Sequence, residues 1–260
     1  MSNDENLVLL GYDDHGEAGR VARITFNNPA KRNALGLGGK TRFIEMMTEI
    51  KHDASLRAVV ITGMGDKSFV GGTNLAEMKD FDLDQAEASA TKTHRVCDAV
   101  RQCPVPTIAR INGYCFGSGF EIAACADMRV GVDGAKFGMP EVRFGIPSGM
   151  EASALPRLIG WGKATELVLT GDHIDAEEAF RIGFLNRLVA PDALDGVVDA
   201  WVASLLAGGP NAVRIQKRLI MDWDRMSVTD GARAGIQAYV ESYRSDEPNR
   251  LMSAFLARKK

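Results

Sequence analysis

Neither sign of charge dominates this sequence. It has 31 Lys and Arg residues against 34 Asp and Glu residues, which gives a formal net charge of −3. Nucleic-acid-binding proteins usually carry a basic excess or a basic stripe, whereas the basic runs here are Lys31-Arg32 and Arg258-Lys259-Lys260. No apolar run approaches the roughly 18 residues of a membrane-spanning helix, and the acidic N-terminus lacks the apolar segment of a signal peptide. We therefore expect no nucleic acid and no membrane as partner.

Cysteine and proline are also scarce. The four cysteines are Cys97, Cys103, Cys115 and Cys125. Their spacing matches no zinc site, and no histidine pair lies near them. We expect reduced core thiols, no bound metal and a cytoplasmic location. The 9 prolines form no tract, which argues against a collagen-like or linker-like chain.

Glycine, by contrast, is plentiful. There are 27 glycines, and twelve of them lie between Gly63 and Gly149. The hydrophobic fraction of 45% and the charged fraction of 25% are ordinary for a globular protein. The clustered glycines therefore indicate special backbone geometry inside a folded domain.

Hydrophobic periodicity predicts alternating strands and helices in the first part of the chain. We expect strands over 21–26, 58–62, 107–111 and 128–132, and helices over 35–50, 86–101 and 118–126. After Gly149 helical patterns dominate, at 152–159, 161–169, 176–182, 192–206, 212–226, 231–243 and 250–257. Alternation of this kind favours crossover connections and largely parallel pairing. We expect an α/β core over 1–200 and a helical C-terminal region over 201–260, which is predicted to pack in an oligomer.

Two glycine-rich segments resemble nucleotide-binding loops but lack a required glycine. Gly38-Gly39-Lys40-Thr41 resembles the end of a P-loop, yet Ala34 stands where the pattern needs glycine. Gly117-Ser118-Gly119 resembles a dinucleotide loop, yet the third glycine position is Ile122. Ser118 also lacks the spacing of a nucleophile elbow.

The remaining candidates are two glycine-rich turns and two carboxylates. The turns are Phe69-Val70-Gly71-Gly72-Thr73-Asn74-Leu75 and Asn112-Gly113-Tyr114-Cys115-Phe116-Gly117-Ser118-Gly119-Phe120-Glu121. The second turn opens a helix, where free N–H groups favour an anionic oxygen; two such groups from separate loops can form an oxyanion hole. Glu121 has apolar or small neighbours, and a buried carboxyl of raised pKa can do acid–base work. Glu141, after Pro140, is on local sequence alone typical of an exposed loop charge.

Together these segments resemble the enoyl-CoA hydratase/isomerase (crotonase) superfamily over nearly the whole chain. The matching stretches, in order, are 28–35, 67–78, 111–127, 137–141 and 155–160. The resemblance implies a crotonase-like spiral of ββα units with a helical C-terminal extension, assembled as a homotrimer or homohexamer. It further implies a hydratase that adds water across the 2,3 double bond of a trans-2-enoyl-CoA, as in fatty acid metabolism, with coenzyme A as part of the substrate and no separate cofactor.

The resemblance also implies roles for individual residues. Glu121 and Glu141 would jointly activate water and protonate Cα, and the N–H groups of Thr73 and Ser118 would form the oxyanion hole. The coenzyme A or substrate site would comprise Arg32, Ala34, Gly71, Gly72, Asn74, Leu75, Gly117, Lys217 and Lys259.

One segment departs from the hydratase pattern. Met150 and Glu151 stand where common members carry two glycines. This loop is expected to border the acyl pocket, so the added bulk bears on acyl-chain preference. Glu151 could be a third carboxylate at the site, although a surface or ion-paired role is favoured.

Three alternatives remain open at this stage. The first is another crotonase-type reaction, either double-bond isomerisation or dehydration of a specialised hydroxyacyl-CoA. The second is RNA binding, but the candidate helix at 41–51 mixes Arg42 and Lys51 with Glu45 and Glu49 and is not a basic stripe. The third is a non-catalytic protein that binds acyl-CoA, which the presence of both glutamates disfavours.

Overall fold

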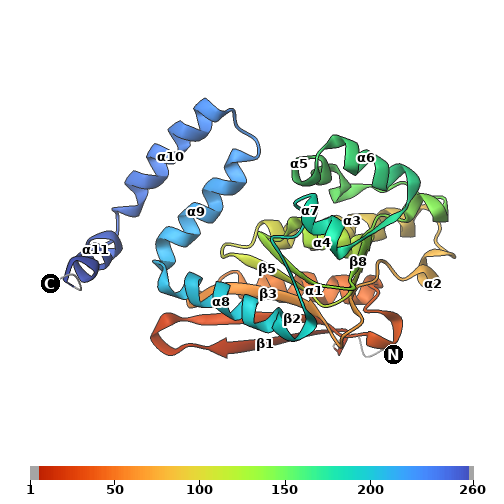
Figure 1. Cartoon of the computed structure of the whole chain (residues 1–260), viewed down its shortest axis with the longest axis horizontal. Helices are drawn as coiled ribbons and strands as arrows, with labels where there is room; N and C mark the ends of the chain where they lie inside the picture. The colour runs from red at the N-terminus through yellow and green to blue at the C-terminus, as the bar shows by residue number, and fades with distance from the viewer. Residues whose placement is uncertain (1–5, 258–260) are drawn as a thin grey trace.

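The computed structural model describes residues 6–257 and shows two sheets surrounded by helices (Figure 1). The larger sheet has six strands in the order β1-β2-β3-β5-β7-β10. Their bounds are Val8–Asp14, Arg20–Phe26, Leu56–Gly63, Thr107–Ile111, Met128–Val132 and Arg187–Val189. The β1–β2 pair is antiparallel and the other pairs are parallel. The prediction of largely parallel pairing is thus right for this sheet beyond its first strand.

The central strand β3 explains why the parallel sheet forms here. Its central residues 58–61 form an apolar run, and seven of its eight residues are buried, as expected for a parallel strand covered on both faces. Helix α8 (Leu194–Ala207) packs against β3, β5 and β7. Helix α1 (Leu37–Ile50) packs against β1 and against α3 (Leu83–Arg101).

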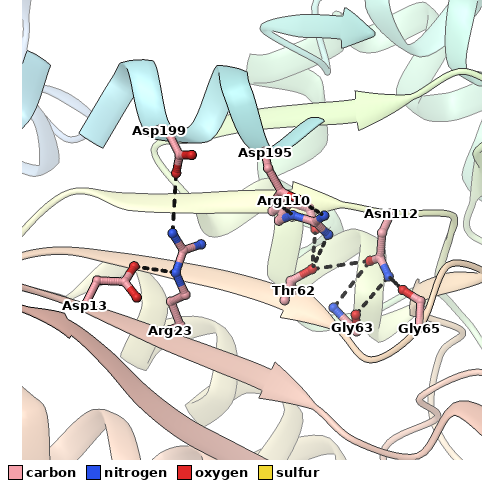
Figure 2. A network of polar contacts seen from close by, with 9 residues as sticks. All are labelled: Asp13, Arg23, Thr62, Gly63, Gly65, Arg110, Asn112, Asp195 and Asp199. Carbon is pink, nitrogen blue, oxygen red and sulfur yellow. Dashed lines mark hydrogen bonds and ion pairs between the residues drawn. The ribbon is translucent and has the colours of Figure 1, made fainter. Parts of the chain in front are cut away.

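Polar contacts fasten α8 to the larger sheet (Figure 2). Arg110 on β5 donates to both carboxylate oxygens of Asp195 on α8, at 2.6 and 3.1 Å. The Arg110 guanidinium also reaches the Thr62 hydroxyl at 3.3 Å. After β5, the Asn112 amide donates to the carbonyl oxygens of Gly63 and Gly65 at 2.8 and 2.6 Å. These bonds fix the loop after β3, which leads directly into the smaller sheet.

The smaller sheet positions the functional turns. Its order is β4-β6-β8-β9, with bounds Ser68–Val70, Tyr114–Phe116, Lys136–Gly138 and His173–Asp175. The first three strands run parallel, and β9 is antiparallel to β8. Each strand has only three residues, which is too short to give a periodic signal, and none was predicted.

Helix α4 (Ser118–Cys125) crosses the interior, and all eight of its residues are buried. Phe120 on this helix stacks on Phe184, with ring centroids 4.1 Å apart. An entirely buried helix normally carries apolar or small side chains on every side. Glu121, the one carboxylate on α4, is an exception and is held inside the protein.

The C-terminal part is helical, as expected. After α4 it contains α5 (Leu155–Ile159), α6 (Trp161–Thr170) and α7 (Ala176–Arg181), and after α8 it contains α9 (Pro210–Trp223), α10 (Val228–Ser242) and α11 (Glu247–Ala257). Helices α10 and α11 extend away from the body (Figure 1). They and α9 expose large apolar side chains, among them Ile220, Trp223, Ile236, Tyr239 and Val240. No helix within residues 6–257 combines the length and apolarity needed to cross a membrane.

Candidate active site

Three turns meet at one edge of the smaller sheet. The carboxyl ends of the parallel strands β4, β6 and β8 lead into Gly71-Gly72-Thr73, Gly117-Ser118 and Met139-Pro140-Glu141 respectively. Because neighbouring parallel strands end at the same edge, segments about 25 to 45 residues apart in sequence converge there, a common location for ligand sites in α/β proteins.

The first turn is held from below by Arg32 and Asn33. Both have a left-handed backbone, with φ of 54° and 56°. The Gly71 N–H donates to the Arg32 carbonyl at 2.8 Å. Asn33 is buried, and its side-chain amide donates to the carbonyl oxygens of Met64 and Ser68 at 3.1 and 2.8 Å. The segment that contains Arg32 and Ala34, both expected at the coenzyme A site, therefore supports the Gly71 turn.

The amides of Thr73 and Ser118 are both available at this edge. The bridge between Leu35 and Thr73 uses the N–H groups of Leu35 and Asn74, so the Thr73 amide lies outside that ladder. Ser118 is the first residue of α4, and the N–H at such a position has no acceptor within its helix. The two side chains are also close, with Thr73 Oγ1 and Ser118 Oγ 3.3 Å apart. The structure thus brings together the two residues expected to form an oxyanion hole.

Glu121 lies one turn into α4 and is only 2% exposed. Its Oε1 accepts a hydrogen bond from the Ala152 N–H at 3.1 Å. Burial raises the pKa of Glu121 to about 8, and the charges of Glu141 and Glu151 act in the same direction. The shift favours the protonated form of Glu121 near neutral pH, where an exposed glutamate is ionised.

Glu141 is partly buried rather than a free loop charge. It begins the 3-10 turn Glu141–Phe144, and burial raises its pKa, although the Ser148 hydroxyl opposes this by donating to Glu141 Oε2 at 2.9 Å. Gly117 faces the other oxygen: a Cβ on this residue would lie 2.6 Å from Glu141 Oε1, and its φ is 52°. The backbone conformation at Gly117 therefore favours glycine, and any side chain there would displace the Glu141 carboxyl.

A cavity of about 440 Å³ connects these groups. Its walls include every member of the two turns that was expected to meet the substrate, apart from Asn74, together with both glutamates: Gly71, Gly72, Thr73, Leu75, Gly117, Ser118, Glu121 and Glu141. The remaining wall is mainly apolar and includes Met78, Phe81, Phe116, Phe144, Ile146 and Met150. Thr73, Ser118 and the two glutamates thus line one largely apolar chamber, as polar groups do in many ligand sites.

The other predicted residues have varied positions. Asn74 caps α2 (Leu75–Met78) by accepting from the Ala76 N–H at 3.2 Å. The exposed Arg32 guanidinium lies 4.8 Å from the centre of the Tyr114 ring. Ala34 lies beside a second, smaller hollow.

Lys217 is not brought to the cavity. Its side chain is 4% exposed, and its Nζ forms an ion pair with Asp127 Oδ1 at 2.6 Å. Lys259, the other residue expected to meet coenzyme A phosphates, lies outside the described residues.

The departing loop behaves differently at its two positions. Met150, with a φ of 42°, reaches the cavity wall. Glu151 is not among the lining residues; it is 4% exposed, and its Oε1 lies 2.8 Å from His94 Nδ1 and 3.3 Å from the Arg101 guanidinium. The structure thus supports the ion-paired role of Glu151. The charge of Glu151 still raises the pKa of nearby Glu121.

Sequence reasoning missed Ser148 and the Ala152 amide, which hold the two glutamates. A hydroxyl shortly after Glu141, in a loop with two glycines, was the only signal for the first. Every residue except proline carries an N–H, so nothing in the sequence marked the second. Within residues 6–257 no cluster of three metal-binding side chains occurs.

Comparison with known proteins agrees with this geometry. The family described as enoyl-CoA hydratase/isomerase matches residues 16–260. The short-chain-enoyl-CoA hydratase of Clostridium acetobutylicum is 32% identical over 243 residues, covering 93% of each chain. The crotonyl-CoA hydratase of Syntrophomonas wolfei is 33% identical over 257 residues, covering 98% of this chain and 96% of the other. The crystal structure of an enoyl-CoA hydratase from Bacillus anthracis superimposes with a TM-score of 0.91 at 29% identity, covering 96% of both chains. The predicted crotonase-like fold is confirmed, and the chain belongs to the enoyl-CoA hydratase/isomerase family.

Proposed function

We propose that this protein is an enoyl-CoA hydratase, a hydro-lyase that adds water across the 2,3 double bond of a trans-2-enoyl-CoA thioester. The observation that carries this proposal is the pairing of Glu121 and Glu141 on the wall of one cavity, each with a raised pKa. Family membership and the hydratase names of the relatives support the same reaction.

The amides of Thr73 and Ser118 bind the thioester carbonyl oxygen. As water adds to C3, negative charge develops on this oxygen in an enolate-like transition state. Donors already aimed at the oxygen stabilise that charge without reorganising, and losing one such donor typically lowers the rate by ~10²–10³-fold. Only backbone groups are needed, so threonine and serine can serve at these positions.

The two glutamates carry the proton transfers. Hydration breaks one O–H bond of water, forms the C3–O bond and places a proton on C2. One carboxylate must therefore accept a proton from water while one carboxylic acid supplies a proton to C2. Burial favours the protonated form of Glu121 up to about pH 8. The neighbouring carboxyl, Glu141, accepts a hydrogen bond from Ser148. Together the two glutamates hold the single proton that this cycle requires.

Coenzyme A is recognised as part of the substrate, and no separate cofactor is involved. The backbone of Gly71, Gly72 and Leu75 lines the cavity, and the exposed Arg32 lies directly beneath the Gly71 turn. With a net charge of −3, the protein must attract the anionic coenzyme through local cations such as Arg32.

An absorbance assay tests the proposal directly. Loss of the conjugated double bond is followed with crotonyl-CoA and with longer trans-2-enoyl-CoAs. Turnover is expected with at least one chain length, and an absence of turnover at every length would overturn the hydratase assignment.

We also infer a homotrimer or homohexamer that works in the cytoplasm. The apolar side chains exposed on α9 and α10, such as Trp223 and Ile236, support burial against other copies of the chain. The four cysteines are free thiols, which suits a reducing compartment. Light scattering coupled to size-exclusion chromatography tests the assembly, and a monomeric mass at micromolar concentration would contradict it.

A further inference from the structure

A buried lysine lies behind one wall of the cavity. Lys40 on α1 is 1% exposed, and it shares the buried face of this helix with the apolar residues Phe43, Met47 and Ile50. Its Nζ donates to Ser89 Oγ at 3.0 Å and to the Ser89 carbonyl at 3.3 Å. Among the residues that the structure describes, Glu77 and Glu121 are the carboxylates whose charges act on this amine, and neither forms an ion pair with it.

This arrangement is costly as mere packing. A buried ammonium loses its hydration and normally requires a charged partner, whereas an apolar side chain of similar volume would fill the same space. Burial lowers the pKa of Lys40 to about 8, and the charges of Glu77 and Glu121 offset this effect only in part. Some function that needs a positive charge at this place would account for it.

Ser89, which is hydrogen-bonded to Lys40, connects this charge to the cavity. It lines the wall on the α3 side, next to the small residues Ala86 and Ala90, with Thr93 one turn further on. Because Ser89 Oγ accepts the Lys40 N–H, one of its lone pairs is occupied, and its own proton is directed toward another acceptor. A donor bonded to a cation is strengthened by that cation.

We propose that Ser89 and Lys40 form a recognition point for a carboxylate on the acyl chain, so that the protein acts on trans-2-enoyl-CoA thioesters whose chain ends in a carboxyl group. This inference rests on the proposed function. The Ser89 hydroxyl donates to the carboxylate, and Lys40, one hydrogen bond behind, supplies the opposite charge. Glu121 and Glu141 line the same cavity as Ser89, and the proposed reaction requires them beside C2 and C3.

The choice of an anion over a neutral oxygen follows from electrostatics. Inside a mostly apolar chamber an unpaired carboxylate is strongly disfavoured, so its entry requires a compensating cation. The two charges together remove the penalty that each would carry alone. A methyl terminus gains nothing from either group and leaves the Ser89 proton without an acceptor, which itself costs affinity.

The test compares matched substrates that differ only at the chain terminus. kcat/KM is measured for trans-2-pentenoyl-CoA against glutaconyl-CoA and for successively longer pairs, each with a methyl and a carboxylate end. The wild type is expected to favour the carboxylate member by about tenfold or more at one length at least. Ser89→Ala and Lys40→Met are each expected to lower this ratio by about 10- to 100-fold, the value of one charge-assisted hydrogen bond.

Lys92→Met provides the matched control. Lys92 also links α3 to α1, through a hydrogen bond from its Nζ to the Thr41 hydroxyl at 2.5 Å, but it is not among the residues that line the cavity. Its replacement is expected to leave the ratio unchanged. A preference for the methyl member at every length, or a ratio that Ser89→Ala and Lys40→Met leave unaltered, would overturn the inference.

A binding measurement separates this inference from the hydratase assignment. Calorimetry with the saturated pair glutaryl-CoA and pentanoyl-CoA, and with longer pairs, needs no turnover. If the wild type hydrates no thioester but still binds a carboxylate-ended member more tightly, and Lys40→Met abolishes that preference, the recognition point stands and the proposed reaction fails. Equal affinities at every length would reject the recognition point itself.

Discussion

The hydroxyl of Ser148 donates a hydrogen bond of 2.9 Å to Glu141 Oε2. This bond links the second glutamate to the loop in which the chain departs from the usual hydratase sequence. Since a hydroxyl stabilises the ionised form of a carboxyl to which it donates, Ser148 opposes the effect of burial on the pKa of Glu141.

Replacing Ser148 by alanine is therefore expected to raise the pKa of Glu141 further. The ionised carboxylate becomes scarcer at low pH, so the acidic limb of the kcat/KM profile moves to higher pH. At neutral pH the rate falls by about tenfold or more, because hydrogen bonds to charged groups are worth about 1.5–3 kcal/mol. The measurement is a pH–rate profile with crotonyl-CoA.

Ser153→Ala is the matched control for that variant. The Ser153 hydroxyl donates to the Met150 carbonyl at 2.9 Å and belongs to the same segment. An identical acidic limb in Ser148→Ala and wild type would contradict the role of Ser148.

Glu121→Gln and Glu141→Gln are each expected to lower kcat by at least about a hundredfold. Glutamine preserves the shape of the side chain but can neither give nor take the proton, and acid–base assistance contributes about 10²–10⁴. Steady-state kinetics at neutral pH measures the loss. Glu45→Gln, on the exposed face of α1, is the control, and a loss of less than about tenfold at either site would remove that residue from the mechanism.

Gly117→Ala is expected to lower activity strongly. The new Cβ would lie 2.6 Å from Glu141 Oε1, on a backbone with φ of 52°, so that either the carboxyl or the turn must move. A displacement of this size at a catalytic group commonly lowers the rate by about a hundredfold.

Gly134→Ala separates backbone strain from this local clash. Gly134 has a φ of 79°, yet nothing lies within 4 Å of a Cβ added there. It is expected to lose about 1 kcal/mol of stability and to keep its rate. Equal rate losses in the two variants would show that the contact between Gly117 and Glu141 has no special importance.

The free energy of unfolding is expected to depend on the charge of Glu121. Its pKa in the folded protein, about 8, lies above the ordinary value of a glutamate in an unfolded chain. The stability contributed by the protonated form is thus complete below the unfolded pKa and is lost as the pH rises toward 8. Glu121→Gln removes this dependence because glutamine does not ionise. The glutamine carbonyl can still accept the hydrogen bond from the Ala152 N–H.

Calorimetric melting curves between mildly acidic and mildly alkaline pH test this expectation. The Tm of Glu121→Gln relative to wild type is expected to increase steadily across that range, by several degrees in total. Parallel Tm curves for the two proteins would mean that Glu121 ionises normally.

The sequence allowed some parts of this architecture to be predicted and not others. The strand at 58–62 was recognised as an apolar run that Gly63 and Gly65 end. The helix at 86–101 was recognised because it is long enough to repeat a helical pattern several times. Strands β4, β6 and β8 have three residues each and contain less than two periods, so they gave no signal. Yet these strands bring the two turns and Glu141 to one edge.

The site was predicted to a similar, partial extent. The resemblance to the crotonase superfamily singled out Glu121 and Glu141, and the structure places both on the wall of one cavity. The supporting contacts were not predicted, since Ala152 acts on Glu121 through a backbone N–H. Lys40 was noted only as part of a segment that resembles a P-loop, and the structure alone shows that it is buried and bonded to Ser89, which lines the cavity.

The placement of Ser118 and Glu121 on one short, fully buried helix has a consequence for how the protein can change over evolutionary time. These two groups move as a single body, so the distance between them is insensitive to substitutions elsewhere. Glu141, Ser148 and Met150 stand instead on a separate stretch between 141 and 154, which is joined to Glu121 by the hydrogen bond from the Ala152 amide. Exchange of that stretch alone would present a new acid, a new wall and a new pKa to the same thioester, which makes it the natural module through which such a scaffold acquires different reactions.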